Sequence, residues 1–486
     1  MRQHIWRAIV SMGAFNPDLS CPEGNFMNDN CCNRSTLGRA PRKSVLSAAV
    51  FAGIAMAGFG AAAVAADDTS LTWNGITLYG TVDIGIAYQS HGAPLSQDFY
   101  PTLQYMIGAS NNKSITTVAS SGLSQSKVGI RGVEPLNDDT SFVFNAESGF
   151  NPTSGKFADG PKSLINNNGI ALVDRKSAGD GSRAGQLFNG QAWGGFASKT
   201  WGTLSIGRHV TLFGDNTTKY DPMNGSYAFS IIGYSGLTAG MGDTQDVRLD
   251  DSVKYTYKYD MFHAGALYQF GKSDGSPGEA WQLGAGFDYA GFSVDALWGE
   301  KKDAIGAATL SAAQLATPGV PHDSLAATIS DNEAWQIAAS YTNGPWKASG
   351  AYEHITFSNP SLPVAPGFSG LGGYWIAFTN NTAFPHDKKF DVSWLGLKYN
   401  FTKDFDITGA WYYYNQDAFG AVKCSDNRAG NCSGNEDVWS LRLDYRFTKR
   451  FDVYAGAAWS KVEDGLAAGF LHDSTTTVMT GFRFNF

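Results

Sequence analysis

The sequence predicts an all-β fold, a transmembrane antiparallel β-barrel of about 16 strands. Three observations support this prediction. The chain begins with a segment typical of exported proteins, most of the remaining sequence alternates between apolar and polar residues, and the connections between the alternating segments are short and long by turns. Short turns at one end of a barrel and long loops at the other are the layout of bacterial outer-membrane barrels.

The N-terminal segment has the three parts of a signal peptide. Basic residues between Arg39 and Lys43 precede the uncharged run 44–66, which ends in small residues from Ala63 to Ala66. The alternative, a membrane anchor, is disfavoured because the many Gly and Ala residues make this run weakly hydrophobic. We therefore expect residues 1–66 to be an N-terminal extension plus signal peptide that is removed, and residues 67–486 to form a single barrel domain.

The composition excludes two classes of protein. No run of about 20 apolar residues follows the leader, so the sequence predicts no membrane-spanning helix. Residues 1–66 hold six of the 36 basic and three of the 44 acidic residues, so the remainder has 30 basic and 41 acidic residues and a formal charge of −11. Nucleic-acid binding requires a basic face, and this acidic balance argues against it.

Alternation with a period of two identifies the strands. Between Ile76 and Tyr88 every second residue is apolar or Gly, whereas a helix would repeat every three to four residues. The apolar faces begin and end in Trp, Tyr or Phe, as in the girdles at membrane interfaces. The opposite faces carry charged residues in mid-strand, which a soluble core would not accept. The predicted strands are 76–88, 127–133, 142–150, 189–198, 203–207, 252–259, 262–270, 281–289, 292–298, 335–341, 346–352, 391–401, 405–413, 439–447, 451–459 and 478–486.

The connections between strands are expected to be long at one end of the barrel and short at the other. Longer loops rich in Gly, Asn and Ser separate the hairpins and are expected on the extracellular side. Sixteen strands would enclose an aqueous lumen, whereas eight would be filled by side chains. The short turns, expected on the periplasmic side, lie near 135–139, 200–202, 260–261, 290–291, 342–345, 402–404 and 448–450.

Two cysteines remain after the leader. Cys424 and Cys432 lie in one predicted loop of an exported chain, and an even pair in this context predicts a disulfide. A metal site is the weaker interpretation, because two cysteines with no His between them supply too few ligands.

Five motifs and the last residue follow one another along the chain: GITLYGTVD at 75–83, SQSKVGIRG at 124–132, FNAESGF at 144–150, WGTLSIGR at 201–208, YRFTKRFDVY at 445–454 and Phe486. In this order they resemble the general porins of Gram-negative outer membranes, particularly the trimeric beta-proteobacterial type. The resemblance covers the chain after residue 70. It implies a homotrimer embedded in outer-membrane lipid, with the third loop folded into each pore and small hydrophilic solutes and ions diffusing through water. It implies no cofactor.

Phe486 is expected to be an assembly signal and the last lipid-facing residue of the closing strand. An open strand edge in lipid leaves backbone groups unpaired, so the last strand must pair with the first.

The pore is expected to narrow where basic and acidic groups face each other across water. Lys127 and Arg131 point into the lumen by alternation, whereas Arg208 ends the strand before the third loop and Arg248 starts the strand after it. These four residues are the expected basic side of the constriction. The negative net charge favours the passage of cations, although the groups at the constriction determine the ion selectivity. The expected acidic side comprises Asp83, Glu147, Asp215, Asp221, Asp243 and Asp246.

The sequence offers weaker support for three other functions. A substrate-specific channel, for sugars or organic anions, is the main alternative because Tyr412, Tyr414 and Tyr454 face the lumen by alternation and could form an aromatic track. An enzyme is disfavoured, since the His-Asp-Ser runs at 322–324 and 472–474 are each contiguous, whereas the members of a catalytic triad converge from separate segments. The third alternative is an adhesin or a structural barrel with a plugged pore, since long loops would serve either. A plug domain, however, needs extra residues, and sixteen strands use nearly all of the mature chain.

The leader generates the first testable prediction. N-terminal sequencing of the protein purified from outer membranes should begin at Ala66 or Asp67, because the small residues before this point form the cleavage site. A mature chain that still contains Arg39 would contradict the signal peptide.

Overall fold

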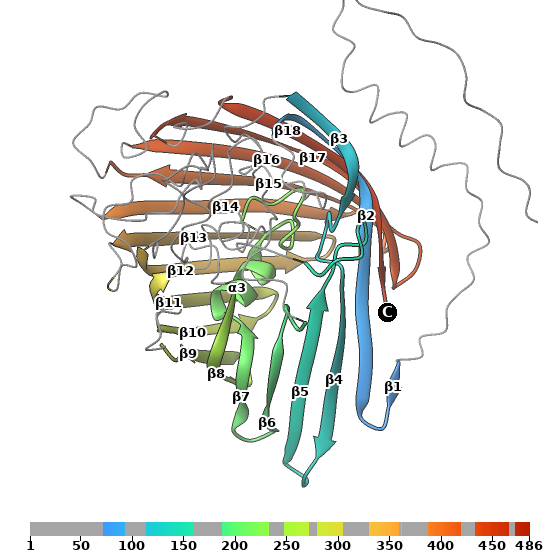
Figure 1. Cartoon of the computed structure of the whole chain (residues 1–486), viewed down its shortest axis with the longest axis vertical. Coiled ribbons are helices and arrows are strands. Elements are labelled where there is room, and N and C mark those ends of the chain that lie inside the picture. The colour runs from blue at the N-terminus through green and yellow to red at the C-terminus, as the bar shows by residue number, and fades with distance from the viewer. Residues whose placement is uncertain are drawn as a thin grey trace, which may run out of the picture. The chain divides into compact units, whose positions relative to one another are not determined.

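The computed structural model describes residues 71–92, 113–158, 187–232, 247–271, 279–304, 330–358, 361, 387–418, 433–465 and 472–486. These residues form an antiparallel barrel with a helix on its inner side (Figure 1). The elements are β1 (Thr72–Trp73), β2 (Ile76–Gly92), β3 (Lys113–Ser120), β4 (Lys127–Pro135), β5 (Thr140–Gly149), β6 (Ala192–Ser198), β7 (Gly202–Val210), α3 (Leu212–Tyr220), β8 (Arg248–Tyr259), β9 (Phe262–Gln269), β10 (Ala280–Tyr289), β11 (Phe292–Ala304), β12 (Ser330–Asn343), β13 (Trp346–Ser358), β14 (Lys388–Asn400), β15 (Phe405–Gln416), β16 (Gly434–Arg446), β17 (Phe451–Asp464) and β18 (Ser474–Asn485).

The barrel is closed and has sixteen strands, as the alternation predicts. Each strand pairs with the next, and β18 pairs with β2 over a register that runs from Thr477 opposite Gln89 to Asn485 opposite Thr81. β3 and β4 both pair with β2 and are the two halves of one strand, interrupted at residues 121–126. The two-residue β1 only pairs with the first two residues of β2 across a tight turn, so it adds no position to the barrel.

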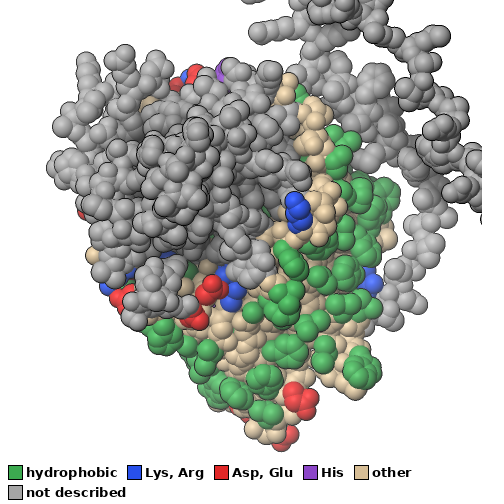
Figure 2. All heavy atoms as spheres, in the orientation of Figure 1, with side chains coloured by type: hydrophobic (Ala, Val, Ile, Leu, Met, Phe, Trp, Pro, Cys, Tyr) green, Lys and Arg blue, Asp and Glu red, His purple; other side chains and the backbone are tan. Residues whose placement is uncertain are grey.

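The two faces of the sheet differ in polarity. Large apolar side chains such as Ile206, Ile337 and Leu441 are at least half exposed on the outer face, where a lipid environment accepts them. Figure 2 shows hydrophobic side chains spread over the part of the surface formed by β2, β4 and β5. The alternate positions face the lumen and are largely polar or charged. No helix among the described residues is long and apolar enough to cross a membrane.

All seven predicted short turns are present. They join β4–β5, β6–β7, β8–β9, β10–β11, β12–β13, β14–β15 and β16–β17, and each is two to four residues long. Several need a left-handed backbone, for example Asp260 at φ 52° and Gly344 at φ 56°, which short hairpin turns commonly require.

The sequence did not predict three elements, β1, β3 and α3, and the strand expected from residue 189 begins at Ala192. Other predictions lie outside the described residues and stay predictions: the signal peptide within 1–66, Asp243, Asp246, the 322–324 run and the disulfide between Cys424 and Cys432.

Phe486 joins the two ends of the barrel. Its amide donates to the Gly80 carbonyl at 3.1 Å, and its own carbonyl accepts from the Gly80 amide at 3.0 Å. A Cβ at position 80 would lie 2.3 Å from the Phe486 ring, so the ring packs directly over this glycine of β2. The terminal residue therefore extends the closing seam by one further pair.

Deleting Phe486 should lower the yield of folded barrel, because the seam loses two backbone hydrogen bonds and the ring that covers Gly80. Pores that do form should keep their conductance in planar bilayers, since the residue lies outside the lumen. Phe486→Tyr retains the ring and the backbone bonds and should fold normally. A normal yield of the deletion variant, measured by heat-modifiable mobility on gels, would contradict this role.

Candidate functional site

The chain turns into the barrel after β7. Residues 211–232, here called the inward segment, begin with Thr211, whose hydroxyl caps α3 by accepting from the Gly214 amide at 3.0 Å. Asp215 in the first turn and Lys219 in the last turn both complement the helix dipole. The wall also holds the start of the helix, because the Leu212 amide donates to the Gln282 side chain of β10 at 2.8 Å.

Polar contacts fix α3 to the lumen wall. Asp215 pairs with Lys254 of β8 at 2.5 Å, and Lys219 pairs with Asp295 of β11 at 2.8 Å. The Tyr220 hydroxyl lies 2.8 Å from that of Ser293. Asn216 donates to Gln336 of β12. The helix thus lies along the wall from β8 to β12.

The second half of the inward segment continues along the wall. Asp221 is fully buried and accepts from the Tyr412 hydroxyl of β15 at 2.6 Å and from the Gly225 amide at 2.7 Å. Burial raises the pKa of the Asp221 carboxyl, and the Tyr412 bond opposes that rise. Arg442 of β16 donates to the Met223 carbonyl at 3.0 Å. These charge-assisted bonds are stronger than neutral ones and hold the segment in place.

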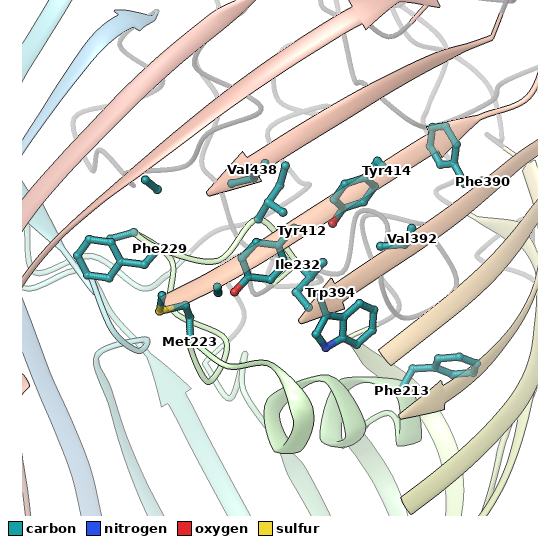
Figure 3. Close-up of a cluster of buried hydrophobic side chains, with 14 of the residues drawn as sticks. Phe213, Met223, Phe229, Ile232, Phe390, Val392, Trp394, Tyr412, Tyr414 and Val438 are labelled. Atoms are coloured by element: carbon teal, nitrogen blue, oxygen red, sulfur yellow. The ribbon is translucent and has the colours of Figure 1, made fainter. Parts of the chain in front are cut away.

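A buried apolar cluster lies beneath the inward segment. Figure 3 shows side chains of the segment facing aromatic and aliphatic side chains of β14, β15 and β16. Full burial of one such side chain stabilises by about 1.5–3 kcal/mol. Its labelled members are Phe213, Met223, Phe229, Ile232, Phe390, Val392, Trp394, Tyr412, Tyr414 and Val438.

The wall around β2, β4 and β5 presents basic groups. Lys127 pairs with Glu147 at 2.8 Å, and the guanidinium of Arg131 lies 5.5 Å from the centre of the Tyr79 ring. The Tyr79 hydroxyl donates to Asn145 at 2.7 Å. Arg131 is exposed, so this wall offers a positive charge to the lumen.

The acids expected at the constriction divide into two groups. Asp83, Glu147 and Asp221 face inward but are almost completely buried, and protein hydrogen bonds or ion pairs occupy them. The Asp215 side chain is 57 % exposed and can act on the lumen. Of the expected acids that the structure describes, Asp215 alone is exposed.

Arg208 lies in a different place from the one expected. Along β7 it alternates with the lumen side: it falls on the same face of the strand as Leu204 and Ile206, which are exposed apolar residues. Ser205 and His209 fall on the opposite face and bond to each other at 2.8 Å. The Arg208 guanidinium pairs with Asp250 at 2.5 Å and donates to the Asn189 carbonyl at 2.8 Å. Arg248 is half-buried at the start of β8. The structure therefore brings Lys127, but not Arg208, together with Arg131.

Lumen ion pairs share a polarity that sequence reasoning missed. In six of them the acid is at most 9 % exposed, whereas the base is 26–39 % exposed. Asp215 and Asp288 are exceptions, with side chains that are 57 % and 40 % exposed. The six pairs are Lys127–Glu147, Lys219–Asp295, Lys398–Asp406, Arg446–Asp406, Arg446–Asp444 and Arg483–Asp452.

The three tyrosines of the suggested aromatic track face the lumen but do not reach its water. Tyr412 and Tyr414 have no exposed surface, and Tyr454 is 2 % exposed. The hydroxyls of Tyr412 and Tyr454 bond to Asp221 and Asp83. These side chains therefore belong to the support of the inward segment.

A closed barrel with an apolar outside, a polar inside and a segment folded into its lumen defines a channel through a membrane. The chain belongs to the Gram-negative porins, whose family model matches residues 46–465. It is therefore a porin of the outer membrane, and its family is one of channels rather than enzymes.

Similarity to known proteins spans nearly the whole barrel. The chain is 26 % identical over 466 residues to an outer membrane porin protein of Bordetella pertussis, which covers 92 % of this chain and 100 % of the relative. Its fold resembles that of an anion-selective porin from Comamonas acidovorans, with 18 % identity and a TM-score of 0.55 over 85 % of this chain and 99 % of that one. The fold also resembles that of OmpT of Vibrio cholerae, with 15 % identity and a TM-score of 0.54 over 86 % of this chain and 100 % of that one.

Gly396 allows the inward segment to lie against β14. A Cβ at this position would lie 2.3 Å from the Pro222 side chain, whereas carbon atoms in contact are about 3.5–4.0 Å apart. Gly396→Ala should push the segment into the lumen and lower the single-channel conductance. Gly409→Ala on β15 is the matched control, because its Cβ would meet nothing within 4 Å. Equal conductance of the two variants would contradict this packing.

Proposed function

We propose that this porin is a homotrimeric, anion-preferring diffusion channel that narrows between the inward segment and the wall of β2, β4 and β5. The exposure of the lumen charges supports this most directly. In six lumen ion pairs, Lys127–Glu147 and Arg483–Asp452 among them, the acid lies against the wall and its basic partner extends towards water. A permeating ion therefore meets mainly positive charge, which attracts anions and repels cations.

The negative net charge of the chain would favour cations, but many of its acids are buried and act little on the lumen. A negative total favours cations only if all acids act equally on the lumen. Charges act at short range, within a Debye length of about 8 Å at physiological salt. Groups such as Glu147, Asp406 and Asp452, each at most 5 % exposed and paired with a base, contribute little net field at the pore axis.

Two comparisons agree with the proposal. One structural relative is an anion-selective porin, and one structure of OmpT is a trimer form. The outer face of β4 also presents Val128 and Ile130, each 40 % exposed, which suit either lipid or a neighbouring subunit. The burial of Tyr412, Tyr414 and Tyr454 removes the basis for a sugar track, which leaves general diffusion as the better-supported mechanism.

Neutralising Arg131 should weaken anion preference, because this exposed guanidinium lies on the wall of the proposed constriction. Arg131→Gln should shift the zero-current potential in a salt gradient towards cations. Arg208→Gln removes the same charge from a position outside the lumen phase and should leave the potential unchanged. The measurement uses planar bilayers with purified pores of equal folded yield. A shift in Arg208→Gln without one in Arg131→Gln would place the constriction elsewhere.

A further inference from the structure

Asp83 of β2 is fully buried and its carboxylate is occupied by hydrogen bonds. One oxygen accepts from the Gly122 amide at 3.0 Å and from the Tyr454 hydroxyl at 2.7 Å. The other accepts from the amides of Leu123 and Ser124 at 2.8 and 2.9 Å. A buried carboxylate needs such partners, and these are three consecutive amides of the turn that interrupts the strand between β3 and β4.

This turn also holds the inward segment. The carbonyl of Gly122 accepts from the Ser226 hydroxyl at 2.8 Å and from the Ala228 amide at 2.9 Å. Phe229 then packs edge-on against Tyr454, with ring centroids 6.2 Å apart. Figure 3 shows Phe229 on the side of the cluster away from Phe213, where the segment has left α3. One residue, Gly122, thus bonds to Asp83 through its amide and to the inward segment through its carbonyl.

The wall has no side chain at the point of closest approach. A Cβ on Gly456 of β17 would lie 2.8 Å from the Phe229 ring, and a Cβ on Gly122 would lie 2.2 Å from the Tyr454 hydroxyl. Both glycines permit contact between backbone and ring that a larger residue would prevent. The contact is therefore specific in shape as well as in hydrogen bonding.

We propose that Asp83 is the positioning residue of the constriction. Through the turn at 121–126 and Tyr454, it fixes the far end of the inward segment against the wall and so sets the size limit of the pore. α3 is anchored separately to β8, β10, β11 and β12. Release of the Asp83 contact therefore frees one end of the segment while the other stays attached.

Three variants test this proposal, each by removing a different group of the contact. Asp83→Asn removes the carboxylate, Tyr454→Phe removes its phenol partner while keeping the ring, and Ser226→Ala removes the bond from the segment. Losing one charge-assisted hydrogen bond shifts an equilibrium by about tenfold or more. We expect Asp83→Asn and Tyr454→Phe, and more weakly Ser226→Ala, to increase the frequency of current substates several-fold. Trisaccharides should also enter liposomes faster relative to monosaccharides.

Asp139→Asn is the matched control. Asp139 also accepts bonds from a backbone amide and hydroxyls, those of Thr200 among them, but it lies in the turn between β4 and β5. This variant should keep wild-type currents and sugar discrimination. If Asp83→Asn fails to fold, the proposal is tested by Tyr454→Phe and Ser226→Ala. Quiet currents and unchanged sugar discrimination in both would overturn the proposal, as would the same substates in Asp139→Asn.

Discussion

A backbone amide that faces lipid has no water to bond, so the two edge strands of this sheet must pair with each other. β2 and β18 meet along their lengths, and Phe486 extends the seam to Gly80. Closure places every strand between lipid and water. Side chains then alternate between two environments, which gives the sequence its period of two and leaves the lumen as the place for charged residues.

The lumen in turn makes the inward segment possible. Residues 211–232 enter a space already lined with hydrogen-bonding groups, and polar contacts attach them at intervals to β8, β10, β11, β12, β15 and β16. Gly396 and Gly456 give the segment room to lie flat against the wall. The segment is therefore a part of the lumen wall, and its position determines how much of the cross-section stays open.

The sequence predicted the barrel because a strand between lipid and water has only two environments, which alternation reports directly. It did not predict α3, whose residues include Gly and two Thr with low helix propensity. That helix depends on the Thr211 cap and on wall contacts distant in sequence. The expected lumen role of Arg208 assumed regular alternation up to the end of the strand before the third loop, whereas Gly207 at φ 138° and an adjacent bulge make the end of that strand irregular.

The alternation of apolar and polar residues also does not show how deeply a lumen-facing side chain is buried. It predicts that Asp83 and Glu147 face the lumen, and Asp221 was expected on the third loop, but the burial of all three depends on partners from other strands and from the inward segment. The sign of the lumen charge follows from depth, because an acid against the wall and a base extended towards water have unequal effects on a permeating ion. Counting charges in the sequence therefore gave a different preference from the one that the structure supports.

The zero-current potential of the wild-type pore in a potassium chloride gradient tests this account most directly. The exposed bases Arg131 and Lys219 and the half-buried Lys127 predict a potential with the sign of preferential chloride permeation. The preference should weaken as salt rises, because screening shortens the reach of the lumen charges. A potential with the sign of potassium preference would contradict the account, since it would mean that buried acids dominate the pore.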